Sequence, residues 1–388
     1  MKLKQLPEDF EVGEINEISI SKEKKGYKAY MLEKRGIETF SLLSYLSGKN
    51  NIPVREFGIA GLKDKHAITR QYFTIPSKYA VNTFHEKDFD IEFLGYTGKG
   101  LKLGELNGNK FEIVVRDIKK GELQGISQKA KNIEQIGVPN YFDSQRFGSV
   151  IGNEFIAKCL IKKDYESAVK IYLTSYTKFE NSKIKNEKRL MLQNWGNFKK
   201  LKLRNRNLVV IIDEYKKSNS WLDEYRKLPR NIREIVISAY QSYLWNECIK
   251  RALIKTINKK KLYNIKYSLG SLLFYKNLDE EEMKKIPNTF KTISEEIKPN
   301  EFEINIINRV LEKEGITLAE FNIKKDTGNF FKVHERNVLL KPLSFSISEP
   351  SIDEINDRGK NNSFKIKLSF SLQKGSYATM ITKRLFNQ

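Results

Sequence analysis

The chain has 388 residues, of which 39% are hydrophobic and 11% aromatic, so it has enough apolar side chains to form buried cores and is no disordered tail. Its 70 lysines and arginines exceed its 48 aspartates and glutamates by 22, and this excess predicts a polyanionic partner. A nucleic acid is favoured over an acidic membrane surface, because the longest aliphatic run, Leu208 to Ile212, is far too short to span a bilayer.

Three local features of the sequence predict a cytoplasmic protein without a bound metal: its N-terminus, its cysteines and its histidines. The first residues carry acids and a proline and no apolar segment of signal-peptide length. Cys159 and Cys248 are far apart and match no metal-ligand spacing. The histidines, His66, His85 and His334, form no zinc pattern, and no phosphate-binding loop motif is present. We therefore predict that the protein uses no cofactor.

Residues 1–118 favour β-structure with short helices. Helical spacing is seen at residues 37–46 and 124–136, and the second of these helices is expected to stop at Gly137, shortly before Pro139. Hydrophobic residues alternate with polar ones over residues 111–116, which is typical of a half-buried strand. The pair Asn107-Gly108 predicts a hairpin turn before this strand.

A polar loop between two strand-like runs contains an isolated acid. Asp64 stands between Lys63 and Lys65 in the segment Gly61-Leu-Lys-Asp-Lys-His-Ala67. Nearby cations favour the ionised form of a carboxylate, which suits a nucleophile or a charge stabiliser better than a proton donor. The alternative is an ordinary solvated turn, since such loops are common.

The character of the chain changes to mainly helical at about residue 154 and returns to β-structure after about residue 341. The clearest helix begins near Pro229 and continues past Cys248. The run from Lys183 to Arg206 holds nine lysines and arginines against one glutamate, with Trp195 and Phe198 interleaved, which predicts either a solvated face or a contact with a phosphate backbone. We therefore expect an α+β fold in which a mainly helical α+β domain, residues 154–341, is inserted into a domain of residues 1–153 and 342–388. The two outer pieces are expected to pair in one sheet.

Five segments, taken in order, resemble the TruD family of tRNA pseudouridine synthases. They are Leu6-Pro-Glu-Asp-Phe10, Ala60-Gly-Leu-Lys-Asp-Lys-His-Ala67, Pro139-Asn-Tyr-Phe-Asp-Ser-Gln-Arg-Phe-Gly148, Ser238-Ala-Tyr-Gln-Ser-Tyr-Leu-Trp-Asn246 and Gly375-Ser-Tyr-Ala-Thr379. The resemblance implies a pseudouridine synthase-like catalytic domain with a mixed or antiparallel sheet, interrupted by an RNA-binding insertion. It also implies an isomerase that converts a uridine of tRNA, at position 13 in the family's usual substrate, to pseudouridine.

The resemblance also implies roles for single residues. Asp64 falls on the family's nucleophilic aspartate, and Phe10, Asn140 and Tyr377 fall on positions that contact the target nucleotide. Lys4 lies where the family can have a basic residue near the active site. Phe142 is expected to face the base, although core packing is the alternative for each aromatic residue. Two departures are Asp143, where the family commonly has glycine, and Gln373, where it usually has proline.

Two other classes of function remain open on the residues alone. A basic RNA-binding protein without catalysis would account for the charge but gives no reason for an acid at position 64. A metal-dependent nuclease would need clustered carboxylates, and a methyltransferase would be expected to carry a glycine-rich loop opening a helix. The sequence near Asp64 has neither pattern.

Overall fold

The computed structural model describes residues 1–177, 180–198, 201, 203–359 and 362–387. Its contacts divide the chain into two compact units, unit 1 (Met1–Val138 and Leu340–Gln388) and unit 2 (Pro139–Leu339). The chain changes unit at Val138/Pro139 and at Leu339/Leu340, whereas the sequence places the domain boundaries at 153/154 and 341/342. Each unit is described separately below.

Unit 1 is built on one mixed sheet, which has ten strands among the described residues. The central strands run in the order β14-β16-β7-β1-β4-β2-β6-β5, with β15 paired to β16 and β3 paired to β4. Only β1 and β4 pair in parallel among the described strand pairs of this sheet. The strands are β1 (Phe10–Ile15), β2 (Tyr27–Arg35), β3 (Gly58–Ile59), β4 (Ile68–Pro76), β5 (Phe84–Glu86), β6 (Phe89–Thr97), β7 (Gly108–Lys119), β14 (Leu343–Ile347), β15 (Ser351–Ile352) and β16 (Ser363–Gln373).

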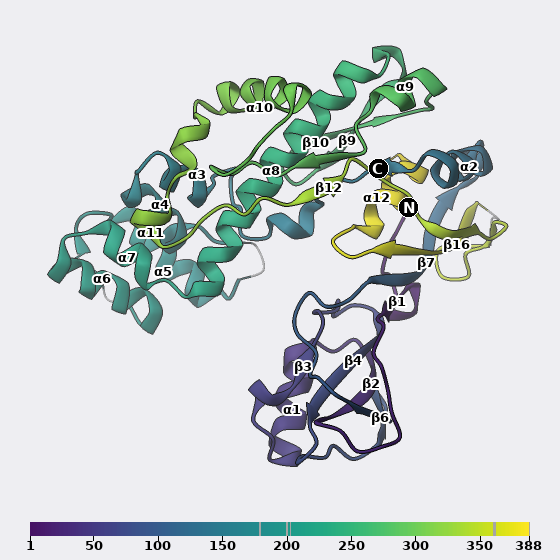
Figure 1. Ribbon diagram of the computed structural model, residues 1–388, viewed down its shortest axis with the longest axis horizontal. Helices are drawn as coiled ribbons and strands as arrows, with labels where there is room; N and C mark the ends of the chain where they lie inside the picture. Colours follow the sequence, from purple (N-terminus) through teal and green to yellow (C-terminus); the bar gives the residue numbers. More distant parts are fainter. Residues whose placement is uncertain (178–179, 199–200, 202, 360–361, 388) are drawn as a thin grey trace. The chain divides into compact units, whose positions relative to one another are not determined.

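Helices cover parts of this sheet. The helix α1 (Thr39–Asn50) buries its leucines against β2, β4 and β6, where Tyr30 and Phe73 stack at 4.9 Å between ring centroids (Figure 1). The amphipathic helices α2 (Ile126–Ile136) and α12 (Ala378–Phe386) contact each other beside β7 and β16. The predicted helix stop is confirmed, because Gly137 follows α2 with φ of 92°.

The two outer pieces of the chain pair as expected, but the predicted hairpin is wrong. β16 runs antiparallel to β7, with Leu368 opposite Ile113. β7 pairs with β1 and β16, so Asn107-Gly108 does not join two neighbouring strands. A Cβ atom at Gly108 would lie 2.4 Å from the carbonyl oxygen of Leu372. Glycine is therefore required here for the close approach of β16 rather than for a turn.

A buried arginine joins segments that are far apart in the sequence. Arg116 of β7 is 6% exposed, and its guanidinium donates to Asp9 at 2.8 Å, to Asp353 at 3.0 Å and to Glu354 at 3.2 Å. Asp9 also accepts from the backbone N–H of Leu6 at 2.9 Å. Asp9, in the motif Leu6–Phe10, therefore holds the backbone just before β1 and, through Arg116, connects it to the C-terminal piece.

Unit 2 is mainly helical, and two short antiparallel sheets of two strands each, β9 with β10 and β11 with β12, lie in its described residues. Its central helix α8 begins after Pro229, as predicted, and its middle is buried around Trp245. The helices are α3 (Ile156–Ile161), α4 (Tyr165–Thr174), α5 (Ser182–Gln193), α6 (Arg206–Ser218), α7 (Trp221–Lys227), α8 (Arg230–Thr256), α9 (Glu280–Lys285), α10 (Glu301–Glu314) and α11 (Lys324–Thr327). The strands are β9 (Leu262–Tyr267), β10 (Gly270–Tyr275), β11 (Thr289–Lys291) and β12 (Glu335–Asn337). The two-residue strands β8 (Val138–Pro139) and β13 (Leu339–Leu340) stand at the changes of unit.

The aromatic residues of the basic run pack inside unit 2. Trp195 stacks on Trp221 at 5.1 Å, and Phe198, which is 6% exposed, meets both of these rings edge-on. These rings therefore pack against one another, with Phe198 buried and Trp195 and Trp221 half-buried. Three cations of the run, Lys199, Lys200 and Lys202, lie outside the described residues.

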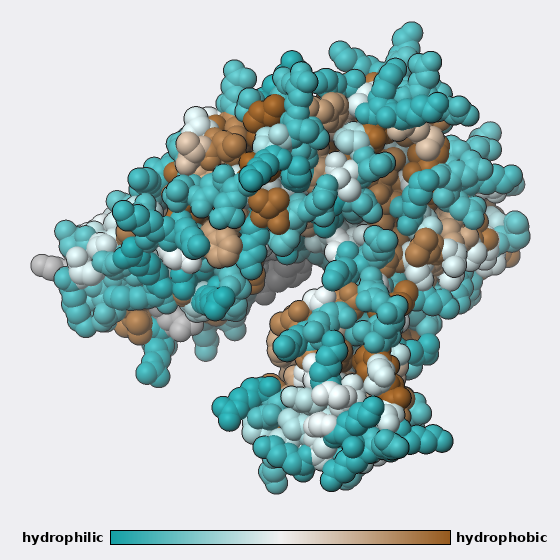
Figure 2. Space-filling model, in the orientation of Figure 1, coloured by the Kyte–Doolittle hydropathy of each residue, from teal (hydrophilic) through white to brown (hydrophobic). Residues whose placement is uncertain are grey.

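Hydrophilic side chains predominate on the face of the molecule seen in Figure 2, as expected for the high proportion of charged residues. Among the residues that the structure describes, no helix combines the length and apolar character needed to cross a membrane. The observed architecture is the predicted α+β class, with a mixed sheet and a mainly helical second unit.

Candidate active site

The loop that carries Asp64 connects β3 to β4 and is held at three backbone positions, Gly61, Lys63 and Asp64. Gln71 of β4 donates to the carbonyl oxygen of Gly61 at 3.3 Å. Thr39 of α1 accepts from the N–H of Lys63 at 3.4 Å, and Lys34 of β2 donates to the carbonyl oxygen of Asp64 at 2.8 Å. These three anchoring side chains are fully buried. Side chains of the sheet and of α1 therefore hold the backbone of the loop, while the Asp64 side chain remains 37% exposed.

The cation in direct contact with the Asp64 carboxylate is Lys4. Its Nζ lies 2.7 Å from Oδ2 of Asp64 and 4.0 Å from the centre of the Phe10 ring. Lys4 has a φ of 54°, an unusual backbone conformation for a lysine that is typical of functional or tightly constrained positions. Phe10 is 4% exposed and packs edge-on against Phe111. The structure thus brings three of the predicted site residues together, with Lys4 between the acid and the aromatic ring.

Lys63 and Arg70, two cations near Asp64 in the sequence, are paired elsewhere. Nζ of Lys63 lies 3.1 Å from the Glu14 carboxylate and donates to Asn109 at 2.9 Å, and both charged side chains of this pair are at most 5% exposed. Arg70 donates to Glu33 at 2.5 Å. Of the cations that the sequence places near this carboxylate, the direct contact therefore comes from Lys4, a residue 60 positions before Asp64.

Lys34 is a buried cation that the sequence analysis missed. Its Nζ donates to the carbonyl oxygens of Ile37 and Asp64, each at 2.8 Å. Burial lowers the pKa of this lysine from 10.5 to about 8, and the negative charges of Asp64 and Glu38 oppose the change. A sequence signal was present, because Lys34 continues the inward-facing alternation of Tyr30 and Leu32 along β2.

Two predicted residues, Asn140 and Phe142, lie in unit 2. Asn140 is 5% exposed, donates to the carbonyl oxygen of Asn337 at 3.0 Å and accepts from Arg336 at 3.4 Å. Phe142 is 9% exposed, with the guanidinium of Arg336 4.0 Å from its ring centre and Trp245 edge-on at 5.6 Å. Arg336 therefore joins the two predicted residues, and it is a further candidate that the sequence analysis did not single out.

The amide of Asn140 retains hydrogen-bonding capacity. A side-chain amide has two N–H donors and two acceptor lone pairs. The contacts with Asn337 and Arg336 use one donor and one acceptor position, so the chemistry of this side chain still suits the edge of a uracil.

The remaining predicted positions lie near element ends. Tyr377 is half-buried and immediately precedes α12 in unit 1. Asp143 has a φ of −96°, so the replacement of the family's glycine requires no left-handed backbone at this turn. Gln373 is the last residue of β16.

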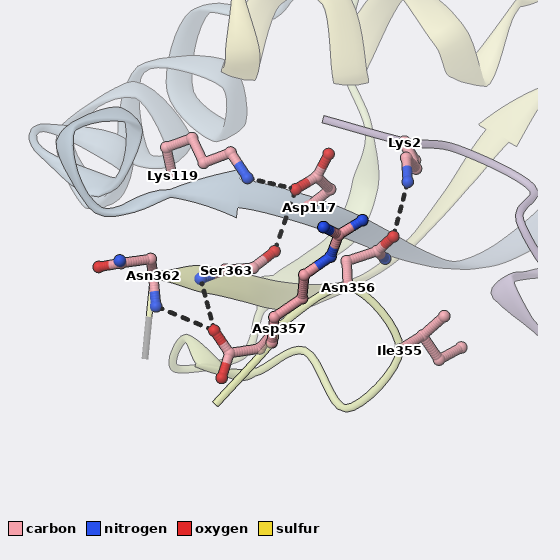
Figure 3. Close-up of a pocket in the computed structure, with 9 residues that line it drawn as sticks. Lys2, Asp117, Lys119, Ile355, Asn356, Asp357, Asn362 and Ser363 are labelled. Carbon is pink, nitrogen blue, oxygen red and sulfur yellow. Dashed lines mark hydrogen bonds and ion pairs between the residues drawn. The ribbon is translucent and has the colours of Figure 1, made fainter. Parts of the chain in front are cut away.

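A polar cavity of about 380 Å³ lies elsewhere in unit 1 and is shown in Figure 3. Lys119 and Ser363 both donate to Asp117, and the backbone N–H groups of Asn362 and Ser363 donate to Asp357. These hydrogen bonds join β7 to the C-terminal piece. We assign this cavity a structural role. Among the described residues, no group of three or more His, Cys, Asp or Glu side chains is arranged to hold a metal ion.

Comparisons with known proteins agree with the motifs. The family model of tRNA pseudouridine synthase D (TruD) matches residues 1–385. The protein named "Probable tRNA pseudouridine synthase D 2" from Methanocaldococcus jannaschii is 42% identical, with 100% of this chain and 92% of the relative covered. The tRNA pseudouridine synthase D of Aquifex aeolicus is 32% identical, with 100% of this chain and 98% of the relative covered.

A solved structure gives the same result for the fold. The crystal structure from Methanosarcina mazei assigned to tRNA pseudouridine synthase D (TruD) superimposes with a TM-score of 0.73 at 27% identity, and it covers 100% of this chain and 93% of that one. The present chain therefore belongs to the tRNA pseudouridine synthase D (TruD) family, and it is a tRNA pseudouridine synthase, an isomerase.

Proposed function

We propose that this enzyme converts uridine 13 of tRNA to pseudouridine and that Asp64 is its nucleophile. The observation that carries the proposal is the Asp64 carboxylate, partly exposed on a loop with three buried anchors and paired with Lys4 at 2.7 Å. A nucleophile needs a carboxylate held in position, and the three anchors of the loop together with the Lys4 contact support this role for Asp64. The position of the uridine in the tRNA follows from the family resemblance.

The reaction exchanges one bond to the ribose for another. The bond between N1 of uracil and C1′ of ribose breaks, the base turns, and a bond forms between C5 and C1′. The proton on C5 is lost and N1 gains one, so that product and substrate are isomers. The Asp64 carboxylate either attacks C1′ or removes a ribose proton as the first bond opens, and both routes require its ionised form.

The other predicted residues would hold the flipped nucleotide. Extruding a base costs roughly a few kcal/mol, and stacking on an aromatic ring returns about 1–3 kcal/mol. Tyr377 is half-buried and suits such stacking. Phe10 is covered by Lys4 on one face, so we assign it to holding Lys4 beside Asp64 as well as to the nucleotide pocket. The family resemblance assigns an edge of uracil to Asn140, which accepts from Arg336, and the Arg336 guanidinium also lies over the Phe142 ring.

The test uses purified protein, an unmodified tRNA transcript and no added cofactor. Pseudouridine is mapped by carbodiimide treatment and primer extension for wild type, Asp64→Asn and Asp64→Ala. Asp88→Asn is the matched control, because Asp88 is an exposed loop acid of the same unit. We expect a stop at uridine 13 with wild type and the control, and none with either Asp64 variant although both still bind the tRNA.

The other results separate the alternatives. Normal turnover by Asp64→Ala would refute the assignment of the nucleophile. Tight binding without a stop on any tRNA would favour a non-catalytic RNA-binding protein. A stop at a different uridine would leave the chemistry in place and correct the substrate position.

A further inference from the structure

A groove of about 750 Å³ in unit 2 lies between the first turns of α8 and the extended segment Gly328–His334. Two side-chain hydrogen bonds hold the segment against the helix. Gln241 of α8 donates to the carbonyl oxygen of Lys332 at 2.8 Å, and Arg233 donates to the side chain of Asn329 at 2.9 Å. The groove is therefore preformed and has the size range of ligand sites in proteins.

An aromatic ring is presented to solvent in this groove. Phe330 is 43% exposed, and its neighbours on both sides are buried, since Asn329 is 7% and Phe331 is 3% exposed. Phe331 packs against Phe321 in the interior, so the alternation of the extended segment turns Phe330 outward. The ammonium groups of Lys324 and Lys332 lie 5.2 Å and 5.5 Å from the centre of its ring. Both ammonium groups lie over the ring on long, exposed side chains, so a stacking base can displace them while their charge remains available to its phosphates.

The charge of the groove favours an anion. Its lining contains four permanent cations against one carboxylate, and that carboxylate, Glu234, already pairs with Arg230 at 2.8 Å. Neither Lys324 nor Lys332 has a carboxylate within ion-pair distance in the part of the chain that the structure describes. His334, which also lines the groove, has a pKa lowered by burial and by Lys332, Arg336 and Arg146. These cations are therefore close enough to raise the local positive potential.

One end of the groove reaches the residues proposed to contact the target nucleotide. Arg146 lines the groove, donates to Ser242 of α8 at 3.0 Å and lies 5.6 Å from the centre of the Phe142 ring. His334 also lines the groove and is two residues before Arg336, which contacts both Phe142 and Asn140. Arg146 and the segment of His334 therefore connect the groove to this cluster within unit 2.

We propose that this groove, named here the Phe330 groove, binds tRNA nucleotides that flank the target uridine, with one unpaired base stacked on Phe330 and the adjacent phosphates on Lys332, Arg146 and Arg230. The inference rests on the proposed function, because it takes the target nucleotide to lie at Asn140 and Phe142. It gives unit 2 a defined contact with the RNA. The groove touches no reacting atom, so it contributes to affinity and to the choice of RNA rather than to the chemical step.

The test compares binding and single-turnover kinetics of the full-length protein with unmodified tRNA. Phe330→Ala should weaken binding by roughly 5- to 150-fold, the loss expected for one stacked base. Phe330→Trp, which keeps a stacking face, should restore affinity. Phe302→Ala is the matched control, because Phe302 also has a lysine, Lys255, 4.9 Å from its ring centre but does not line the groove. With enzyme in excess, the maximal rate of Phe330→Ala should equal that of wild type at a higher half-saturating concentration.

Lys332→Ala tests the phosphate contact separately. Removing one cation that neutralises a phosphate should weaken binding and reduce the slope of log Kd against log salt by about 0.7 to 1. An unchanged slope would overturn this contact.

The outcomes distinguish this inference from the proposed function. Unchanged binding by Phe330→Ala, or an equal loss with Phe302→Ala, would overturn the Phe330 groove even if wild type forms pseudouridine normally. A lower maximal rate without a shift in half-saturation would also overturn it. If wild type binds tRNA without modifying it, the proposed function fails, while the comparison of binding still decides whether Phe330 contacts the RNA.

Discussion

Replacing Lys34 by methionine should reduce catalysis because it releases the backbone of the nucleophile. Lys34→Met keeps most of the side-chain length but loses the hydrogen bonds to the carbonyl oxygens of Ile37 and Asp64. A displacement of reacting groups by about 1 Å can cost on the order of 100-fold in rate, and we expect a loss of kcat of about that size with little change in tRNA affinity. Rates are compared at saturating tRNA by carbodiimide mapping.

The same replacement has a defined effect on stability. The charge-assisted hydrogen bonds that are lost are worth roughly 1.5–3 kcal/mol each. Removing the buried ammonium has the opposite effect, because it also removes the free-energy cost of burying a charge. This cost is expressed in the fall of the pKa from 10.5 to about 8 and amounts to roughly 3 kcal/mol at neutral pH. The two effects largely cancel, so we expect a net loss of about 0–3 kcal/mol in the free energy of unfolding at neutral pH.

The pH dependence separates these two effects. A folded-state pKa below the unfolded value means that the unfolded chain holds the proton more tightly. The penalty is therefore present in full below about pH 8 and is relieved as the pH rises towards 10.5. The free energy of unfolding of the wild type should rise by roughly 2.5 kcal/mol between about pH 7 and pH 10, and that of Lys34→Met should not. The difference in stability between the two proteins should therefore grow by that amount.

Urea unfolding followed by far-UV circular dichroism measures this difference at the two pH values. Lys28→Met is the matched control, because Lys28 is on the same strand and donates to a backbone carbonyl, that of Tyr79, at 2.8 Å. The reasoning is refuted if the deficit of Lys34→Met is the same at both pH values, or if Lys28→Met loses as much kcat.

Three further predictions concern other residues. Lys4→Met should lower kcat by roughly 10- to 100-fold with tRNA binding retained, because it removes the cation 2.7 Å from Asp64. Unaltered single-turnover rates would contradict this prediction. Burial and, after it, nearby cations lower the pKa of His334, and binding of tRNA should raise this pKa because phosphates offset those cations. NMR titration measures the change with His85, on β5 of unit 1, as the reference, and a fall at His334 would count against the assignment. Arg116→Met should lower the free energy of unfolding by about 3–5 kcal/mol, because it leaves Asp9 and Asp353 buried without their cation. A loss below about 1 kcal/mol in urea unfolding would show that this ion-pair network is dispensable.

Several elements could be predicted from the sequence because local patterns determine them. The helix after Pro229, the stop at Gly137 and the alternating strand around Ile113 each depend on residues that are close together in the chain. The turn signal at Asn107-Gly108 failed for the opposite reason. Glycine at that position is required by a strand more than 250 residues later, and no local pattern contains that information.

The roles of the charged residues depended on the tertiary structure. The sequence placed Asp64 between two lysines, and this was enough to identify a candidate carboxylate. The family resemblance placed Lys4 near the site. The sequence could not tell that Lys4 contacts Asp64 directly, that Lys63 pairs with buried Glu14, or that Lys34 holds the backbone. Ion pairs and buried hydrogen bonds join residues that the sheet brings together, and sequence distance does not constrain these pairings.

By itself, the sequence determined the family, the α+β class, the basic character and the candidate nucleophile, because motifs, composition and periodicity are properties of the linear chain. Only the tertiary structure decided which aromatic rings are packed and which are exposed. Trp195 and Phe198 lie in a cluster with Trp221, although their cationic surroundings in the sequence suggested RNA contact. Phe330 is turned outward between two buried neighbours. Burial is set by what packs against a side chain, and that is fixed only when the whole unit has folded.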